Sequence, residues 1–279
     1  MLRYLLCLLV VIFFTNCSKN KNYQVTGTIL ELRKESKQLL IKHDEIPGFM
    51  MPMTMPFNLL DTLGIQNLSL GDSVKFILTV NQNESYAHDF FILGKGTIIT
   101  PDLDWQDEHE PLEIGQLLSN ASFLDLDSQL VSLSDSDGKL RLISFIFTRC
   151  PMPNMCPAVV LKNSYLAEQF KNDQIEFIII SFDYLFDSPS IMKLNYSSYK
   201  NKHSNLQFYS SWNNINSIYS IAGQSFVRFW GIEENDIGHS LRSILVDNER
   251  RLLLSYDGLD WKPEKAAKDI KNILDTYNF

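Results

Sequence analysis

Length, composition and charge narrow the class of this protein. The chain has 279 residues, 45% of them hydrophobic, and a formal net charge of −8. It is long enough for one large or two modest cores, and its charges are mixed along the chain, which argues against global disorder. An acidic balance without a basic stripe argues against nucleic acid as a partner.

The N-terminus predicts an export signal. Arg3 supplies a minimal positive charge, and an unbroken apolar run from Tyr4 to Phe14 is too short to span a bilayer but suits a signal-peptide core. Cys17 follows at the position of the lipidated cysteine of a bacterial lipoprotein. We expect a lipoprotein signal peptide over residues 1–16 and a lipidated Cys17 with a tether over 17–22, the alternative being an ordinary secretory signal. The expected location is the bacterial cell envelope, lipid-anchored to the membrane and facing the periplasm.

The next segment, residues 23–100, has the pattern of an all-β domain. Short strand-like runs cover residues 23–32, 37–43, 71–80 and 86–96, and Gly27 suggests a bulge or bend. Several short strands in fewer than eighty residues predict a small barrel, OB-like, or a sandwich.

A methionine-rich stretch, "HDEIPGFMMPMTMPF", interrupts this β pattern. Met53 and Met55 are two residues apart, so on a strand both face the same side, which a methionine-filled core would also explain. Thioether sulfur is a soft ligand suited to Cu(I), and a neutral His43 imidazole would complete a three-coordinate site. The stretch therefore predicts either a core stripe or a soft-metal site, and we favour the metal.

An acidic linker is expected over residues 101–116, followed by an α/β domain over 117–279. Continuous apolar runs at 141–148 and 175–183 predict strands buried on both faces, and residues 157–172, 188–201 and 262–277 predict helices. Residues 120–140 suggest a hairpin with an Asp-Gly turn, and 241–247 with 251–258 a terminal strand pair. This alternation predicts a thioredoxin-like layer.

Two cysteines remain in the folded body, Cys150 and Cys156, in "FTRCPMPNMCP". Pro151 and Pro153 exclude a regular helix between them, so the pair lies in a loop after a buried strand, at the sheet edge where α/β proteins bind ligands. Three interpretations stay open: a structural disulfide, a redox couple, or a copper site on two thiolates and a third ligand.

Three segments together, "LISFIFTRCPMPNMCP", "IISFDYLFDSPSIMKLNY" and "GHSLRSILVD", resemble the Sco/SenC family of copper proteins. The resemblance implies a thioredoxin-like fold and a copper site built from Cys150, Cys156 and His239. It also implies that Asp183 influences the site from outside the ligand set. The usual family spacing is C-x3-C, whereas this chain has C-x5-C, which alters the loop geometry.

The methionine stretch is similar to the periplasmic copper-binding module of the CusF-like type. That resemblance implies His43, Met53 and Met55 as ligands, with Met50 as a candidate fourth in place of the aromatic residue that caps the metal in that module. The resemblance covers roughly residues 23–99.

Together these features predict an exported, membrane-anchored copper protein. We expect a copper chaperone, with Cu(I) or Cu(II) as cargo, that serves cytochrome c oxidase subunit II or another copper acceptor; we do not expect an enzyme. One alternative is a thiol-disulfide oxidoreductase, in which Cys150 and Cys156 would be catalytic. Another is a tolerance protein that only sequesters copper.

Overall fold

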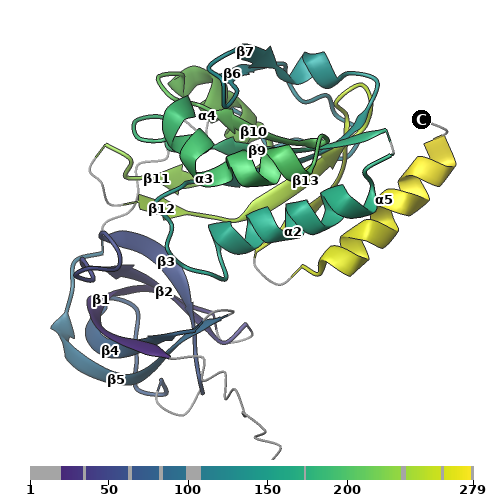
Figure 1. Ribbon diagram of the computed structural model, residues 1–279. Helices are drawn as coiled ribbons and strands as arrows, with labels where there is room; N and C mark the ends of the chain where they lie inside the picture. Colours follow the sequence, from purple (N-terminus) through teal and green to yellow (C-terminus); the bar gives the residue numbers. More distant parts are fainter. Residues whose placement is uncertain are drawn as a thin grey trace, which may run out of the picture.

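The computed structural model describes two domains (Figure 1). Its described residues are 20–33, 36–61, 65–81, 84–98, 108–172, 174–233, 237–258 and 261–277. The expected signal peptide (1–16) and Cys17 lie outside them, so the structure does not bear on either expectation. Within the described ranges, no helix combines the length and the apolar character that crossing a membrane requires.

The N-terminal domain is an all-β sheet. Its five strands, in spatial order β3-β2-β1-β4-β5 and all antiparallel, are β1 (Lys21–Arg33), β2 (Gln38–His43), β3 (Met53–Asn58), β4 (Asp72–Val80) and β5 (Ser85–Lys95). Buried residues alternate along β1, β2 and β4, as a strand with one face on a core requires. A bridge between Leu59 and Ala87 brings the chain after β3 to β5, whereas a closed OB-like barrel stays a prediction.

Gly27 has a different role from the expected bulge. The register of β1 against β2 shifts between Ile29 and Glu31, not at Gly27. A Cβ atom on Gly27 would lie 2.5 Å from the carbonyl oxygen of Lys42 and 2.8 Å from the Cα of His43. Gly27 therefore allows β1 to approach β2 closely beside His43.

The second domain is an α/β layer. Its sheet has the order β14-β13-β8-β9-β10-β6-β7, in which the central β8, β9 and β10 are parallel and their neighbours antiparallel. The strands are β6 (Ser122–Leu124), β7 (Leu130–Ser132), β8 (Leu140–Ile146), β9 (Ile175–Ser181), β10 (Leu206–Ser210), β13 (Arg242–Val246) and β14 (Leu252–Asp257). Every residue of β8 is buried, as the continuous apolar run predicts.

Helices flank this sheet (Figure 1). They are α2 (Cys156–Gln169), α3 (Pro189–Lys202), α4 (Ile215–Gln224) and α5 (Pro263–Tyr277), with a short 3-10 helix η1 (Leu133–Ser136). Proline lies in the first turn of α2 and α3, where its missing N–H costs no helical hydrogen bond. Ser188 precedes α3, but its hydroxyl bonds that of Ser190 rather than capping the helix.

The hairpin forms with another turn than expected. β6 and β7 are connected through Asp125, whose carboxylate accepts the backbone N–H groups of Asp127 and Gln129 at 2.8 Å. Asp137 and Gly138 instead follow η1. A side chain that accepts nearby N–H groups thus closes this loop without the Asp-Gly pair.

The described part of the expected linker, residues 108–116, runs along the α/β domain. The backbone N–H of Leu112 donates to the carbonyl of Gln224, and that of Gly115 donates to Leu252. These bonds attach this part of the segment to the domain, while most of its residues are exposed.

Two short strands from the α/β part of the chain extend the N-terminal sheet. β11 (Phe229–Trp230) pairs with β12 (Ile237–His239), and β12 pairs in parallel with β3 of the N-terminal domain, which gives a seven-stranded sheet β11-β12-β3-β2-β1-β4-β5. Figure 1 shows β12 at the edge of the α/β domain, next to β3. The Ser85 hydroxyl adds a second link, donating to Asn154 Oδ1 at 3.1 Å.

Candidate metal centre

The two cysteines lie beyond the carboxyl ends of the parallel strands. Cys150 is in the loop after β8, and Cys156 is the first residue of α2. Both are buried and both are free thiols. The loop folds back because its prolines prevent a helix until α2 begins.

Cys150, Cys156 and His239 converge on one point. One sulfur or ring-nitrogen atom from each residue lies within 4.8 Å of those from the other two, and all three residues are buried. Among the described residues, this is the one group of three or more His, Cys, Asp or Glu side chains close enough to hold an ion. The structure thus brings together the three residues that the sequence suggested as ligands.

His239 is oriented for coordination. Its ring lies against Phe147 and Phe182, with centroids 5.2 and 5.4 Å away, and its Nδ1 is 3.3 Å from the Ser240 carbonyl. A proton on Nδ1 directed at that carbonyl leaves the Nε2 lone pair available for a metal. Nε2 is buried with no hydrogen-bond partner. Two soft sulfurs and this nitrogen form a donor set that fits copper.

The two thiols differ in acidity. A hydrogen bond from Cys156, together with the adjacent His239 imidazole, holds the pKa of Cys150 well below its usual range despite burial. Burial, with Cys150 beside it, raises the pKa of Cys156. Cys150 is thus the more acidic thiol of the pair.

Asp183 is linked to the cysteine loop by a hydrogen bond with Arg149. The Asp183 carboxylate accepts hydrogen bonds from Arg149 Nε at 2.8 Å and Phe186 N–H at 3.1 Å. Burial raises the pKa of Asp183, and Arg149 opposes that rise. Because Arg149 immediately precedes Cys150, Asp183 fixes the start of the cysteine loop, while its effect on metal binding stays a prediction.

Asp187 is a positioning residue that the sequence did not reveal. It is buried and accepts hydrogen bonds from the Thr148 N–H at 2.8 Å, the Thr148 hydroxyl and the Ser181 hydroxyl. Burial raises its pKa to about 6, against those hydrogen bonds. The second aspartate of "FDYLFDSP" is Asp187, which directly precedes the expected helix. An aspartate at that position is typical of a helix N-terminus and does not point to the cysteine loop.

The methionine stretch forms part of the N-terminal sheet. His43 on β2 is paired directly with Met53 on β3, and Met55 follows on the same face as Met53. Met50 is buried in the turn before β3, where it bridges to Ile46. His43 Nδ1 lies 2.7 Å from the Asp44 carbonyl, and its ring meets Phe57 edge-on at 5.6 Å. The pairing thus brings His43 beside Met53, and the burial of these residues suits a methionine-rich core as well as a metal site.

The remaining histidines lie elsewhere. His88 Nε2 is 2.9 Å from the Thr79 hydroxyl, and His203 Nε2 is 2.9 Å from the Ser164 hydroxyl. His109 lies against Gly223 of α4. None of the three is in the group formed by Cys150, Cys156 and His239.

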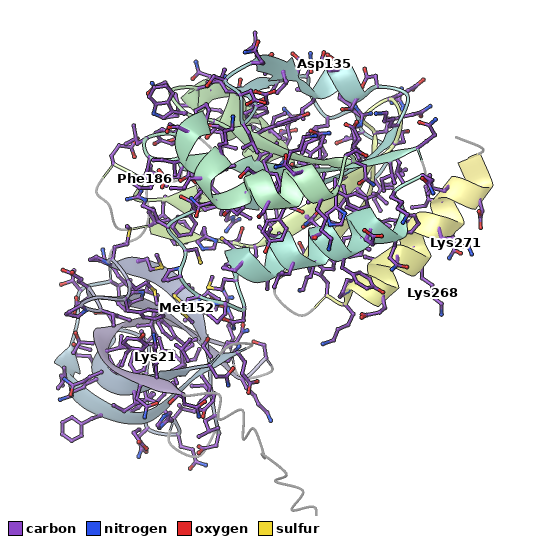
Figure 2. The ribbon with its side chains drawn as sticks, in the orientation of Figure 1. Lys21, Asp135, Met152, Phe186, Lys268 and Lys271 are labelled. Atoms are coloured by element: carbon purple, nitrogen blue, oxygen red, sulfur yellow. The ribbon has the colours of Figure 1, made fainter. Side chains whose placement is uncertain are left out.

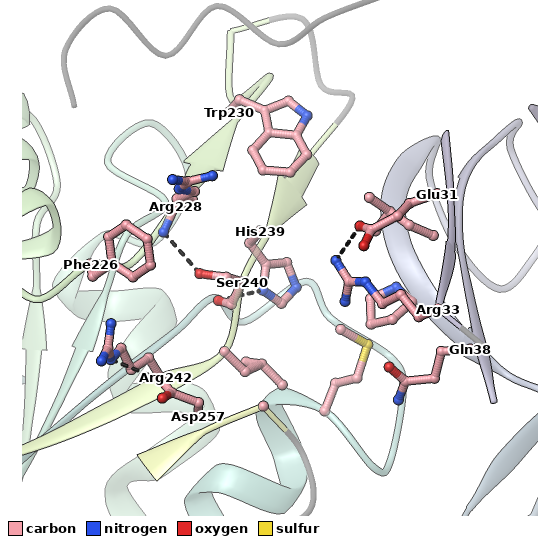
Figure 3. Close-up of a pocket in the computed structure, with 15 residues that line it drawn as sticks. Glu31, Arg33, Gln38, Phe226, Arg228, Trp230, His239, Ser240, Arg242 and Asp257 are labelled. Atoms are coloured by element: carbon pink, nitrogen blue, oxygen red, sulfur yellow. Dashed lines mark hydrogen bonds and ion pairs between the residues drawn. The ribbon is translucent and has the colours of Figure 1, made fainter. Parts of the chain in front are cut away.

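A large cavity adjoins the centre. It has a volume of about 620 Å³ and is lined by residues of both domains, among them His239, Met155, Leu40 and Pro56 (Figure 3). Figure 3 shows His239 across this space from Glu31 and Arg33 of β1. The site thus faces the N-terminal domain.

A thioredoxin-like domain with a Cys-Cys-His centre, joined to a small β domain with a His-Met cluster, defines a class of copper-binding proteins. The SCO1/SenC family model matches residues 115–275, more than half of the chain, and the model of the copper-binding periplasmic protein CusF matches residues 22–87. The chain therefore belongs to the SCO1/SenC family and carries an N-terminal CusF-like copper-binding domain, and copper is its metal.

Solved structures share the fold of the α/β domain. Copper-bound ScoI from Arabidopsis thaliana is 20% identical, with a TM-score of 0.50, and the match covers 58% of this chain and 100% of that one. A SCO1/SenC family lipoprotein from Bacillus anthracis str. Ames is 21% identical, with a TM-score of 0.50, over 57% of this chain and 95% of that one. No curated protein sequence matches the chain.

Proposed function

We propose that this protein is an exported, membrane-anchored copper chaperone. The CusF-like domain captures Cu(I) through His43, Met53 and Met55, with Met50 as a further ligand. The SCO1/SenC domain holds copper through Cys150, Cys156 and His239 and passes it to cytochrome c oxidase subunit II or another acceptor. Family membership, the periplasmic CusF relationship and a lipoprotein relative support this role and a lipid-anchored periplasmic location.

One observation carries the proposal: the two cysteine sulfurs and the imidazole of the centre converge within 4.8 Å, with the imidazole Nε2 buried and without a hydrogen-bond partner. A buried polar atom without a partner costs free energy, so a ligand-binding role explains why it is kept. Two sulfurs and one nitrogen favour copper over the hard cations magnesium and calcium.

Anaerobic Cu(I) titration of the purified protein tests both sites. We expect the wild type to bind two equivalents, Cys150→Ser with Cys156→Ser to bind one, and Met53→Leu with Met55→Leu to bind one. Met192→Leu, a buried methionine of α3, is the matched control and should still bind two. If the wild type takes up one equivalent, the variants show which site does not bind; if it takes up none, the proposal fails.

A thiol-disulfide oxidoreductase is the second candidate, favoured by the lowered pKa of Cys150. It needs both cysteines but not the imidazole. His239→Ala should abolish copper retention if the protein is a chaperone, and should leave reductase turnover intact if it is an oxidoreductase. His203→Ala is the control, since that imidazole contacts Ser164 instead.

A third role, copper sequestration, is separated by a deletion strain. Loss of a chaperone lowers oxidase activity and is relieved by added copper. Loss of a sequestering protein makes cells sensitive to copper while the oxidase stays active.

A further inference from the structure

The parallel pair of β3 and β12 connects the two metal-binding motifs. Ile237 is paired with Met53, and Gly238 with Thr54. β12 carries His239 at its end, and β3 carries the two methionines. Neighbouring strands are about 4.8 Å apart, so one strand spacing separates the backbones that hold the two sites.

The ligands of both motifs point to the same face of this sheet. Residues paired across strands share a face, and residues two apart on a strand share a face. Because Ile237 is paired with Met53, His239 lies on the face of Met53 and Met55, and His43, paired with Met53, lies there too. Gly238, between Ile237 and His239, lies on the opposite face of β12. The Trp230 ring covers that face, because a Cβ atom on Gly238 would lie 2.1 Å from it.

One hydrogen bond and two shared cavities place the cysteine loop beside the N-terminal domain. Arg149 lines a cavity of about 360 Å³ together with Met50, Met51 and Pro52. Asn154 accepts the hydrogen bond from Ser85, and Met155 faces the larger cavity lined by Leu40 and Pro56. Figure 2 shows sulfur atoms gathered where the domains meet, around Met152. The C-x5-C loop is therefore part of the interface between the domains.

We propose that copper passes directly from the CusF-like site to the Cys150–Cys156–His239 site across the β3–β12 pairing, while the two domains are docked. This inference rests on the proposed function and adds the route. The shared sheet favours a docked transfer over a search by two separated domains.

The step is a ligand exchange without electron transfer. Bonds from Cu(I) to the His43 imidazole and to the thioethers of Met50, Met53 and Met55 break. Bonds to the sulfurs of Cys150 and Cys156 and to His239 Nε2 form in their place. The thiol that is still protonated releases its proton to water. An anionic thiolate is a stronger ligand for a soft cation than a neutral thioether, which sets the direction.

A charge placed at the interface tests the route. Ser85 is buried against Asn154, so Ser85→Lys should separate the domains without changing a proposed ligand. Ser69→Lys, an exposed position in the same domain, is the matched control. Asn154→Glu combined with Ser85→Lys should restore docking through an ion pair. Amide hydrogen exchange of β12 reports docking in each variant.

The readout is the rate at which one equivalent of Cu(I) protects Cys150 and Cys156 from alkylation. We expect a rate independent of protein concentration in the wild type and Ser69→Lys, and at least tenfold slower, concentration-dependent arrival in Ser85→Lys and in Met53→Leu with Met55→Leu. The double charge variant should recover the wild-type rate. Equal rates in the wild type, Ser85→Lys and the methionine variant would overturn the route. Failure of the proposed function is distinct, since the wild-type thiols would then stay unprotected at equilibrium.

Discussion

Arg141 shows how one residue of the α/β core depends on its partners. The guanidinium is fully buried at the start of β8 and donates to the carbonyls of Leu133 at 3.0 Å and Asp247 at 2.7 Å. Asp137 supplies the counter-charge, with its Oδ1 2.6 Å from Arg141 Nη1, and it also pairs with Arg250. A buried cation is tolerated because these acceptors pair with both of its terminal nitrogens.

Asp137→Asn should lower the free energy of unfolding by about 1–3 kcal/mol at pH 7. The loss is smaller than for a fully buried ion pair because solvent screens the partly exposed carboxylate. Burial raises the pKa of Asp137, but the hydrogen bonds from Arg250 and Arg141 outweigh it and hold the pKa below its ordinary value of 3.8. Since the folded state has the lower pKa, this stabilisation is present above pH 3.8 and is lost as the pH falls below it.

Urea unfolding of the wild type and variant at pH 7 and near pH 3 measures the effect. Asp127→Asn, which removes an exposed ion pair with Lys193, is the control and should cost less than 1 kcal/mol. Equal losses in the two variants, or a loss that persists at low pH, would contradict the explanation.

The candidate ligands of the centre were predictable as residues, but the residues that position them were not. Cys150, Cys156 and His239 stood out through residue type, spacing and family resemblance, whereas C-x5-C alone allowed a disulfide, a redox pair or a metal site. Asp187 carries no comparable signal, because an aspartate before a helix is common and its bonds to Thr148 and Ser181 arise only when β8 and β9 lie side by side.

At the scale of elements, Gly27 controls the contact of β1 with β2. Gly27→Ala would bring a Cβ against the Lys42 carbonyl and the His43 Cα, which are backbone atoms that cannot rotate away. We expect a loss of about 1–3 kcal/mol in unfolding free energy and weaker Cu(I) binding at the His43–Met53–Met55 site. Chemical denaturation and Cu(I) competition titrations measure the two effects. Gln24→Ala, an exposed position of β1, should leave both unchanged, and normal copper affinity in Gly27→Ala would show that His43 need not stay in place.

Long elements were predictable because their patterns are strong. The runs that became β8 and β9 and the proline-led α2 and α3 lie where periodicity and composition placed them. β11 and β12 were missed because they contain two and three residues, too few to show a period. The Asp-Gly turn was a wrong prediction for the hairpin, because the Asp125 side chain closes the turn by accepting two backbone N–H groups. The sequence pattern of an Asp-Gly turn contains no sign of such a contact.

Removing copper should destabilise the molecule as a whole, because a ligand that binds only the folded state stabilises it. At a free copper concentration about one hundred times Kd the gain is about 2.7 kcal/mol, which corresponds to a Tm increase of about 5–10 °C. Calorimetry of chelator-treated and Cu(I)-loaded protein should show that difference. Cys150→Ser with Cys156→Ser should remove most of it, and an unchanged shift in that variant would place the stabilising copper elsewhere.

The two-domain organisation followed from the sequence, but the joining of the domains did not. Each domain has its own composition and its own family relationship. Their junction depends on two residue pairs between strands far apart in the chain, and on the contact of Ser85 with Asn154. Such pairing is a property of the assembled surfaces, which no local pattern records.

β12 is held on one flank by β11 and on the other by β3. An acceptor protein that displaced the CusF-like domain would turn β12 into an edge strand with only two residue pairs left, and an edge so short opens readily. His239, the last residue of β12, would then be held less firmly beside the two cysteines. The three residues of β12, Ile237–His239, therefore join the two domains and also hold His239 in the centre.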